Sequence, residues 1–110
     1  MTIDHAATLH HPARDEIDLP AVLHAFSDPQ RLQIVRELAA DSEPRPCGTI
    51  ELGVTKSTMT HHFRVLREAG VIRQERHGTT KLTSLRRDDL EVRFPGLLEA
   101  VLSSARLVTT

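Results

Sequence analysis

Hydrophobic residues recur at steps of three and four in several segments, the spacing that places side chains on one face of a helix. The first two such segments cover residues 18–26 and 29–40; Asp18 and then Pro20 stand at the start of the first, and Asp28 directly precedes Pro29 at the start of the second. Aspartate favours the cap position and proline the first turn, so both segments are predicted to be helices. A polar, proline-rich loop over 41–46 and a short third helix over 47–52 are expected next, with a last helix over 95–104.

The most informative segment is residues 52–72, LGVTKSTMTHHFRVLREAGVI, which is typical of a turn, an amphipathic helix and the start of a strand. Gly53 suits the turn because glycine adopts positive φ without steric cost. Thr55 is placed to cap the helix and Gly70 to end it. One face of this helix carries the apolar residues Met59, Phe63, Leu66 and Ala69. The opposite face is polar and partly basic, with Lys56, Ser57, Thr60, His61 and Arg64.

Residues 71–86, VIRQERHGTTKLTSLR, predict a β-hairpin that turns near residues 77–79. Its arms hold few apolar residues, so one of its faces is expected to be solvated or bound. Asp88 and Asp89 are placed to cap a short helical turn after the hairpin. The order of elements therefore predicts a mainly α fold with a small β-hairpin, the winged helix-turn-helix.

Although the net charge is only -1, positive and negative residues are unevenly distributed along the chain. Residues 54–87 hold eight lysine and arginine side chains against two glutamates, a net charge of +6, whereas the remainder of the chain sums to −7. This asymmetry is expected when one part of a domain faces phosphate. The alternative is a basic, solvated hairpin without a partner.

The polar face of the helix after Gly53 fits the DNA major groove, which is wide enough to admit a helix. Arg64 could pair with a guanine edge or clamp a phosphate, and Lys56 at the helix start suits phosphate. Cations on the hairpin would form a wing along the phosphate backbone or in the minor groove. The alternatives are an ordinary solvated helix face and a charged hairpin that discourages strand pairing. The candidate DNA-binding residues are Lys56, Ser57, Thr58, Thr60, His61, Arg64, Arg73, Arg76, His77 and Lys81.

Other sequence features narrow the class of protein. No apolar run approaches the roughly 20 residues needed to span a bilayer, and the first residues lack the pattern of a secretory signal. The single cysteine excludes an internal disulfide. These features predict a cytoplasmic protein with no membrane partner. No nucleophile elbow, phosphate-binding loop or carboxylate pair is present, so the chain is not expected to be an enzyme or to require a cofactor.

Two further features are candidates for a sensing site. Residues 1–14 lack a periodic apolar face and are expected to form a flexible arm, in which His5, His10 and His11, with Asp4, are weak candidate ligands for a divalent metal ion. Cys47 could be a redox sensor because a thiol near a helix start is stabilised as thiolate, and the alternative is an inert cysteine. Adjacent histidines in an arm can also be incidental.

His62 needs a separate interpretation, because it directly follows a candidate DNA-binding histidine. It points about 100° away from His61 around the helix, toward Met59 and Leu66. We therefore expect it to be a partly buried packing or hydrogen-bonding residue and not a ligand.

Three stretches, AFSDPQRLQIVRELA, LGVTKSTMTHHFRVLREAGVI and RQERHGTTKLTSL, resemble the ArsR/SmtB family of bacterial transcription regulators, and the resemblance covers roughly residues 15–105. It implies a homodimeric winged helix protein that binds operator DNA, commonly as a repressor, with the winged domain over 15–106. The family's dimer is built from the terminal helices, here 18–26 and 95–105. The resemblance thus implies a dimer interface that includes Leu19, Leu23, Leu97, Leu98, Val101, Leu102 and Ala105.

The chain departs from the metal-sensing members of that family. It lacks a Cys-x-Cys pair before the recognition helix, and no histidine follows His77. Three hypotheses about the function therefore remain. The leading one is a homodimeric regulator on a pseudo-palindromic operator, to which a co-regulator protein could add the sensing function. The others are a metal- or redox-responsive sensor with a non-standard site, and a protein-interaction module without operator binding.

Overall fold

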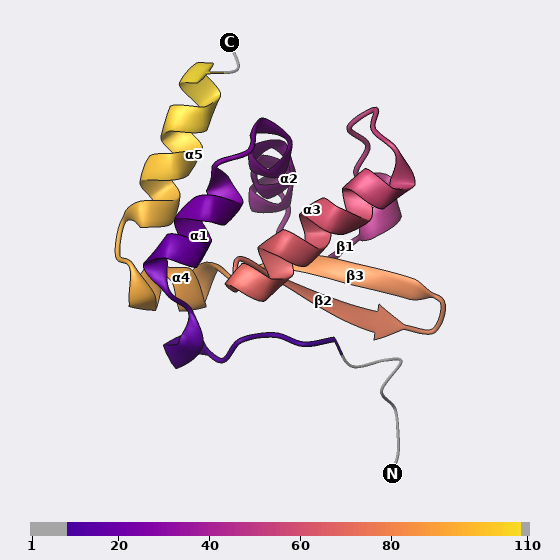
Figure 1. Cartoon of the computed structure of the whole chain (residues 1–110), viewed down its shortest axis with the longest axis horizontal. Coiled ribbons are helices and arrows are strands. Elements are labelled where there is room, and N and C mark those ends of the chain that lie inside the picture. Colours follow the sequence, from indigo (N-terminus) through magenta and orange to yellow (C-terminus); the bar gives the residue numbers. More distant parts are fainter. Residues whose placement is uncertain (1–8, 109–110) are drawn as a thin grey trace.

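A computed structural model describes residues 9–108, with side chains up to Ala105. The helices pack together beside a small three-stranded antiparallel sheet, and the β2–β3 hairpin of this sheet extends away from them (Figure 1). In chain order the elements are η2 (Arg14–Glu16), α1 (Leu19–Phe26), α2 (Pro29–Ala40), β1 (Arg45–Pro46), η3 (Cys47–Thr49), α3 (Lys56–Ala69), β2 (Ile72–His77), β3 (Thr80–Leu85), α4 (Arg87–Arg93) and α5 (Leu97–Val108). None of the helices in these residues is both long enough and apolar enough to cross a membrane.

The starts of α1 and α2 are confirmed in detail. Asp18 accepts a hydrogen bond from the backbone N–H of Ala21 at 2.9 Å, and Asp28 accepts from those of Gln30 and Arg31. Each helix carries a proline in its first turn, where its missing N–H costs nothing. The buried stripes of the two helices, which include Val22, Phe26, Ile34, Val35 and Leu38, form the centre of the core.

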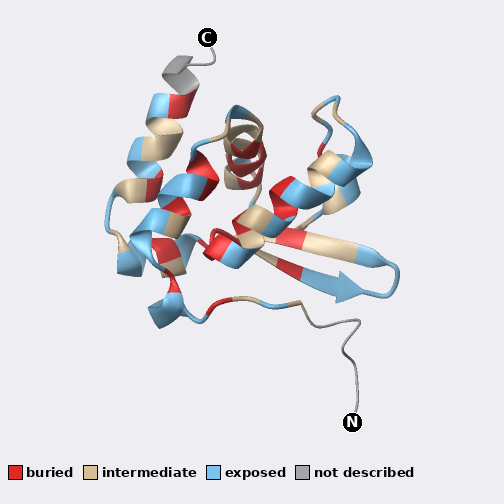
Figure 2. Cartoon of the chain, in the orientation of Figure 1, coloured by how far each residue is buried: buried red, intermediate tan, exposed pale blue. Residues whose placement is uncertain are grey.

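Helix α3 also begins and ends as predicted. The Thr55 hydroxyl accepts from the Thr58 N–H at 3.2 Å, and Gly70 takes a left-handed conformation with φ 90°. The predicted apolar stripe faces the core, because Phe63, Leu66 and Ala69 are buried and Met59 is half-buried. Figure 2 shows this division of α3 into a buried and an exposed side.

The predicted hairpin is confirmed, and a third strand pairs with it to form the sheet. The register runs from Ile72 opposite Leu85 to His77 opposite Thr80. Residues 41–46 were expected to be a loop, but Arg45–Pro46 forms strand β1 against β3, giving the order β1-β3-β2. The proline masked this strand in the sequence, although a proline is tolerated at a sheet edge.

Three predicted elements need correction. The helix expected over 47–52 is a single 3-10 turn, after which Ile50 is extended and buried in the core; a segment this short gains too few helical hydrogen bonds. Asp88 and Asp89 lie inside the first turn of α4 and do not cap it. The last helix begins at Leu97 and not at residue 95, because Gly96 has φ 84°, and it continues past residue 104 to Val108.

The end of the predicted arm contacts the folded domain. Residues 1–8, which include the candidate ligand His5, lie outside the described residues. Pro12 is buried, and its carbonyl accepts a 2.8 Å hydrogen bond from Arg86. The backbone N–H of Gln74 on β2 donates to His11 Nε2 at 3.0 Å. Residues 9–14 therefore make specific contacts, which the absence of an apolar periodicity did not predict.

Candidate nucleic-acid interface

The polar face predicted on α3 is exposed along its whole length. It consists of Lys56, Ser57, Thr60, His61 and Arg64. Steps of three and four residues along the helix connect these side chains into one surface. The face holds two cations and three groups that can donate or accept hydrogen bonds.

Thr58 differs from the other candidates on this helix. It is half-buried, and its hydroxyl accepts a 2.9 Å hydrogen bond from the Thr55 hydroxyl. The structure therefore places Thr58 in the N-terminal cap of α3, beside the polar face and not on it.

The candidate residues of the hairpin divide between its two faces. Arg76 lies opposite Lys81 in the register, on the same face as Gln74, whose side-chain oxygen accepts from Arg67 of α3 at 2.8 Å. Arg76 and Lys81 therefore belong to the face turned toward α3, while His77 is exposed next to the hairpin turn. Arg73 lies on the other face, with its guanidinium 3.7 Å from Asp89.

Asp89 pairs with two of the cations counted in the +6 segment, and with Arg14 from outside it. Its carboxylate accepts from Arg14 at 2.7 Å and from the buried Arg86 at 2.8 Å, with Arg73 nearby. Burial by itself raises the pKa of Asp89, but the hydrogen bonds from Arg14 and Arg86 outweigh it and hold the pKa below its ordinary value. Arg87 is also engaged within the chain, where it donates to carbonyls at the end of α2.

The positive charge facing outward is therefore more localised than the sequence suggested. Of the eight lysines and arginines at 54–87, Arg73 and Arg86 form ion pairs with Asp89, and Arg67 and Arg87 donate to neutral groups. In the described part of the chain, neither kind of partner is found for Lys56 and Arg64 on α3 or for Arg76 and Lys81 on the hairpin. The charge asymmetry of the sequence thus becomes a smaller cluster formed by α3 and the wing.

The buried hydrogen-bond network between α3 and the core contains Arg31, which the sequence did not mark as a candidate residue. Arg31 is 6% exposed and donates to the carbonyls of Ala25 and His24 at the end of α1. Its Nη1 also lies 3.3 Å from Nδ1 of His62 on α3. One guanidinium therefore connects α1, α2 and α3. The burial of Arg31 could have been predicted from its spacing, because it precedes Ile34 and Val35 by three and four residues and so lies on the same buried face of α2.

His62 is 5% exposed, as its position on the helix predicted. Because a guanidinium can only donate, His62 Nδ1 is the acceptor from Arg31, and Nε2–H donates to Gln30 Oε1 at 2.7 Å. This arrangement requires a neutral imidazole. Burial lowers the pKa of His62, and the nearby Arg31 lowers it further, against an opposing effect of Asp28 at 4.0 Å.

The candidate sensing residues are not gathered at one place. Within residues 9–108, no three His, Cys, Asp or Glu side chains lie together in a way that could hold a metal ion. His10 is exposed, whereas His11 accepts the hydrogen bond from Gln74, and burial lowers its pKa. Cys47 is a half-buried free thiol on η3.

Apolar residues of the implied dimer interface differ in exposure. Leu19 and Leu23 on α1 are 42% and 47% exposed. On α5, Leu98 and Ala105 are buried in the chain's own core, while Leu97, Val101 and Leu102 are half-buried.

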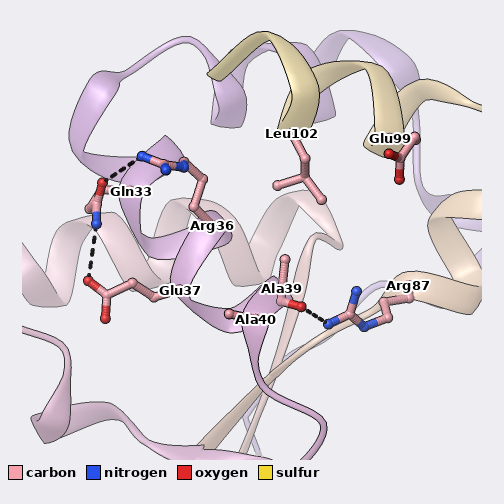
Figure 3. A pocket seen from close by; sticks show the side chains of 8 residues that line it. All are labelled: Gln33, Arg36, Glu37, Ala39, Ala40, Arg87, Glu99 and Leu102. Carbon is pink, nitrogen blue, oxygen red and sulfur yellow. Dashed lines mark hydrogen bonds between the residues drawn. The ribbon is translucent and has the colours of Figure 1, made fainter. Parts of the chain in front are cut away.

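A pocket of about 480 Å³ lies between α2 and α5 (Figure 3). Its two arginines are both engaged: Arg36 donates to Gln33, and Arg87 donates to carbonyls that include that of Ala39. Glu37 and Glu99 add negative charge. Both cations among the described lining residues are therefore already engaged in hydrogen bonds within the chain.

The succession of α2, η3, a glycine turn, α3 and the β2–β3 hairpin defines the winged helix-turn-helix class of fold. A family model described as a helix-turn-helix domain matches residues 26–75. YceK of Bacillus subtilis (strain 168), an uncharacterized HTH-type transcriptional regulator, is 35% identical to the chain over 82 residues, which are 73% of this chain and 82% of YceK. Because this match spans most of both proteins, the chain belongs to the HTH-type transcriptional regulators.

Two further proteins are similar to the chain. MJ1325 of Methanocaldococcus jannaschii, also an uncharacterized HTH-type transcriptional regulator, is 36% identical over 59 residues, which are 53% of this chain and 66% of that protein. The crystal structure of Rv0081 of M. tuberculosis superposes with a TM-score of 0.60 at 24% identity, covering 82% of this chain and 88% of Rv0081. The likeness to Rv0081 shows a shared fold.

Proposed function

We propose that the protein is a DNA-binding repressor of the ArsR/SmtB type, which binds a pseudo-palindromic operator as a homodimer. The observation that carries this proposal is the continuous exposed face of α3, supported by the hairpin cations. Two recognition helices related by a dimer axis would enter successive major grooves about one helical turn apart.

The residues divide into two roles. Lys56, Arg76 and Lys81 would contact phosphate, a contribution to affinity that depends steeply on salt. Ser57, Thr60, His61 and Arg64 would contact base edges, which carry the sequence information. Arg73 is a positioning residue in this scheme, because its guanidinium is directed to Asp89.

Replacing Arg64 with alanine tests the assignment. Genomic DNA fragments are first selected by binding to the protein, and the affinity for a selected site is then measured at low and high salt. Arg64→Ala should cost roughly 1–3 kcal/mol of binding free energy and relax the base preference at one position of the site. Arg36→Ala, an equivalent change on α2 away from this face, should leave the affinity unchanged.

The outcomes discriminate among the alternatives. Equal weakening of Arg64→Ala on unrelated sequences would make Arg64 a phosphate clamp and not a base reader. The absence of site preference at any salt concentration would contradict the operator-binding proposal and favour an interaction module. Repeating the titration with divalent metals tests whether a metal ion controls the affinity.

A further inference from the structure

A second pocket, of about 380 Å³, lies at the edge of the exposed face of α3. Its walls come from η3, α3, the hairpin and the N-terminal segment. We call it the α3 pocket and define it by Leu9, Ile50, Met59, Phe63, Arg67 and Lys81. Its size lies in the range of pockets that bind small molecules.

The walls of the α3 pocket combine apolar and cationic side chains. Leu9, Ile50, Met59 and Phe63 supply apolar surface from three separate segments. Lysine and arginine are its only charged residues, since its described lining contains no aspartate or glutamate. Such a lining complements a molecule that joins an apolar body to a negative charge.

Arg67 gives the pocket a specific hydrogen-bonding site. Its Nη1 donates to Gln74 at 2.8 Å, but its Nε is buried and has no hydrogen-bond partner within the described residues. It is the one buried side-chain nitrogen or oxygen in residues 9–105 left in this state. A buried donor without an acceptor is costly, so the polar groups of Arg67 are incompletely satisfied within the described chain. The guanidinium also lines the pocket, where its accessible part can donate to a bound carboxylate.

We propose that the α3 pocket binds a small organic carboxylate with an apolar body, and that an occupied pocket disfavours DNA binding. The carboxylate would accept a hydrogen bond from Arg67, and the apolar body would contact Met59 and Phe63. The effect on DNA rests on the function proposed above. It follows from shared residues, because Lys56, Thr60 and Arg64 line this pocket and also belong to the exposed face of α3.

Direct binding is tested without DNA by calorimetric titration of octanoate, with 1-octanol as the uncharged equivalent. Octanoate should bind to one site per chain, and 1-octanol should bind roughly tenfold more weakly or worse, because it lacks the charge that Arg67 pairs with. No octanoate binding, or equal binding of the two compounds, would overturn the proposal.

Variants locate the site. Arg67→Gln should weaken octanoate binding by roughly tenfold or more, as expected when a hydrogen bond to a charged donor is lost. Leu9→Glu places a negative charge at the pocket from the N-terminal segment, outside the helices, and should weaken binding similarly, so the test does not depend on the stability of one variant. Arg36→Gln on α2 does not line this pocket and should change binding less than about twofold. Unchanged binding in both pocket variants would assign octanoate to another place.

The effect on DNA is measured separately, with a selected site titrated in the presence and absence of saturating octanoate. By linkage, octanoate should weaken DNA binding by the same factor by which DNA weakens octanoate binding. Unchanged DNA affinity with octanoate bound would overturn the regulatory part of the proposal. If the protein binds octanoate but no DNA, the proposed repressor function fails while the carboxylate site stands.

Discussion

His62 lies on α3, but both of its ring nitrogens contact residues of α2 and not the exposed face. Its neutral form accepts from Arg31 and donates to Gln30, so a second ring proton would face the guanidinium and remove the acceptor. Protonation of His62 would therefore weaken the hydrogen bonds that join α3 to α2. Asp28, 4.0 Å away, opposes this effect without cancelling it, because the pKa of His62 is lowered overall.

Stability should therefore fall as the pH decreases through the ordinary histidine value of 6.5. Below that value the unfolded chain binds a proton that the folded chain still rejects, so the free energy of unfolding decreases until the lowered pKa is reached. Urea denaturation at about pH 7.5 and about pH 5.5 measures this difference. His62→Gln should reduce it, although His11 contributes with the same sign.

His24→Gln is the matched control for that experiment, because His24 is an exposed histidine on α1. It should leave the pH dependence of the wild type intact. An identical pH dependence in the wild type and in His62→Gln would show that the Arg31–His62 contact does not control protonation.

At the scale of elements, the end of α3 depends on a close approach between two segments. A methyl group on Gly70 would lie 2.6 Å from Cγ1 of the buried Ile17, in the segment between η2 and α1. Gly53, before α3, also has a positive φ of 73°, but an added methyl group there meets nothing within 4 Å.

The two glycines therefore provide a matched pair of substitutions. Gly53→Ala should cost only the strain of the left-handed backbone, about 1–2 kcal/mol of unfolding free energy. Gly70→Ala should cost that amount and roughly 1–3 kcal/mol more from overpacking against Ile17. Urea denaturation of both variants gives the difference, and equal losses would contradict the packing argument.

The elements that the sequence predicted well are those defined by local signals. Asp18, Asp28, Thr55 and Gly70 act on residues within four positions of themselves, and each begins or ends its helix as expected. Strand β1 escaped prediction because its partners, Thr83 and Leu82, lie more than 30 residues away. Without that partner, a two-residue strand has no pattern of its own.

In the candidate site, too, the sequence does not show which cations are paired when the partner lies on a distant element. Arg73 and Arg76 look equivalent in the sequence, but alternation along β2 turns Arg73 to the face where Asp89 lies. Asp89 comes from α4, so the sequence could not reveal which arginine is neutralised. Lys56 and Arg64 were predictable, because the periodicity of α3 alone places them opposite the buried stripe.

At the scale of the whole molecule, the exposed leucines of α1 provide a test of the proposed homodimer. Leu23→Glu places a charge on a side chain that is 47% exposed, and it should dissociate the dimer by burying that charge without a partner. Sedimentation velocity measures the oligomeric state. Operator affinity should fall in parallel, because a monomer engages only one half-site.

Val92→Glu is the control, since Val92 on α4 is 58% exposed and lies outside the proposed interface. It should remain dimeric with unchanged operator affinity. A monomeric wild-type protein, or a Leu23→Glu variant that stays dimeric, would contradict an interface built on α1.

The hydrogen bond between Gln74 and His11 has a practical consequence. Strand β2 is at the outside of the sheet, and this backbone N–H, which has no neighbouring strand to bond to, is held by an imidazole. Its rate of exchange with deuterium in the solvent therefore reports whether residues 9–14 are in place on the sheet. Acidification should lower the protection of this amide relative to an unstructured amide at the same pH, because a protonated His11 loses its acceptor nitrogen. A single amide thus makes the docking of the N-terminal segment observable in solution by nuclear magnetic resonance.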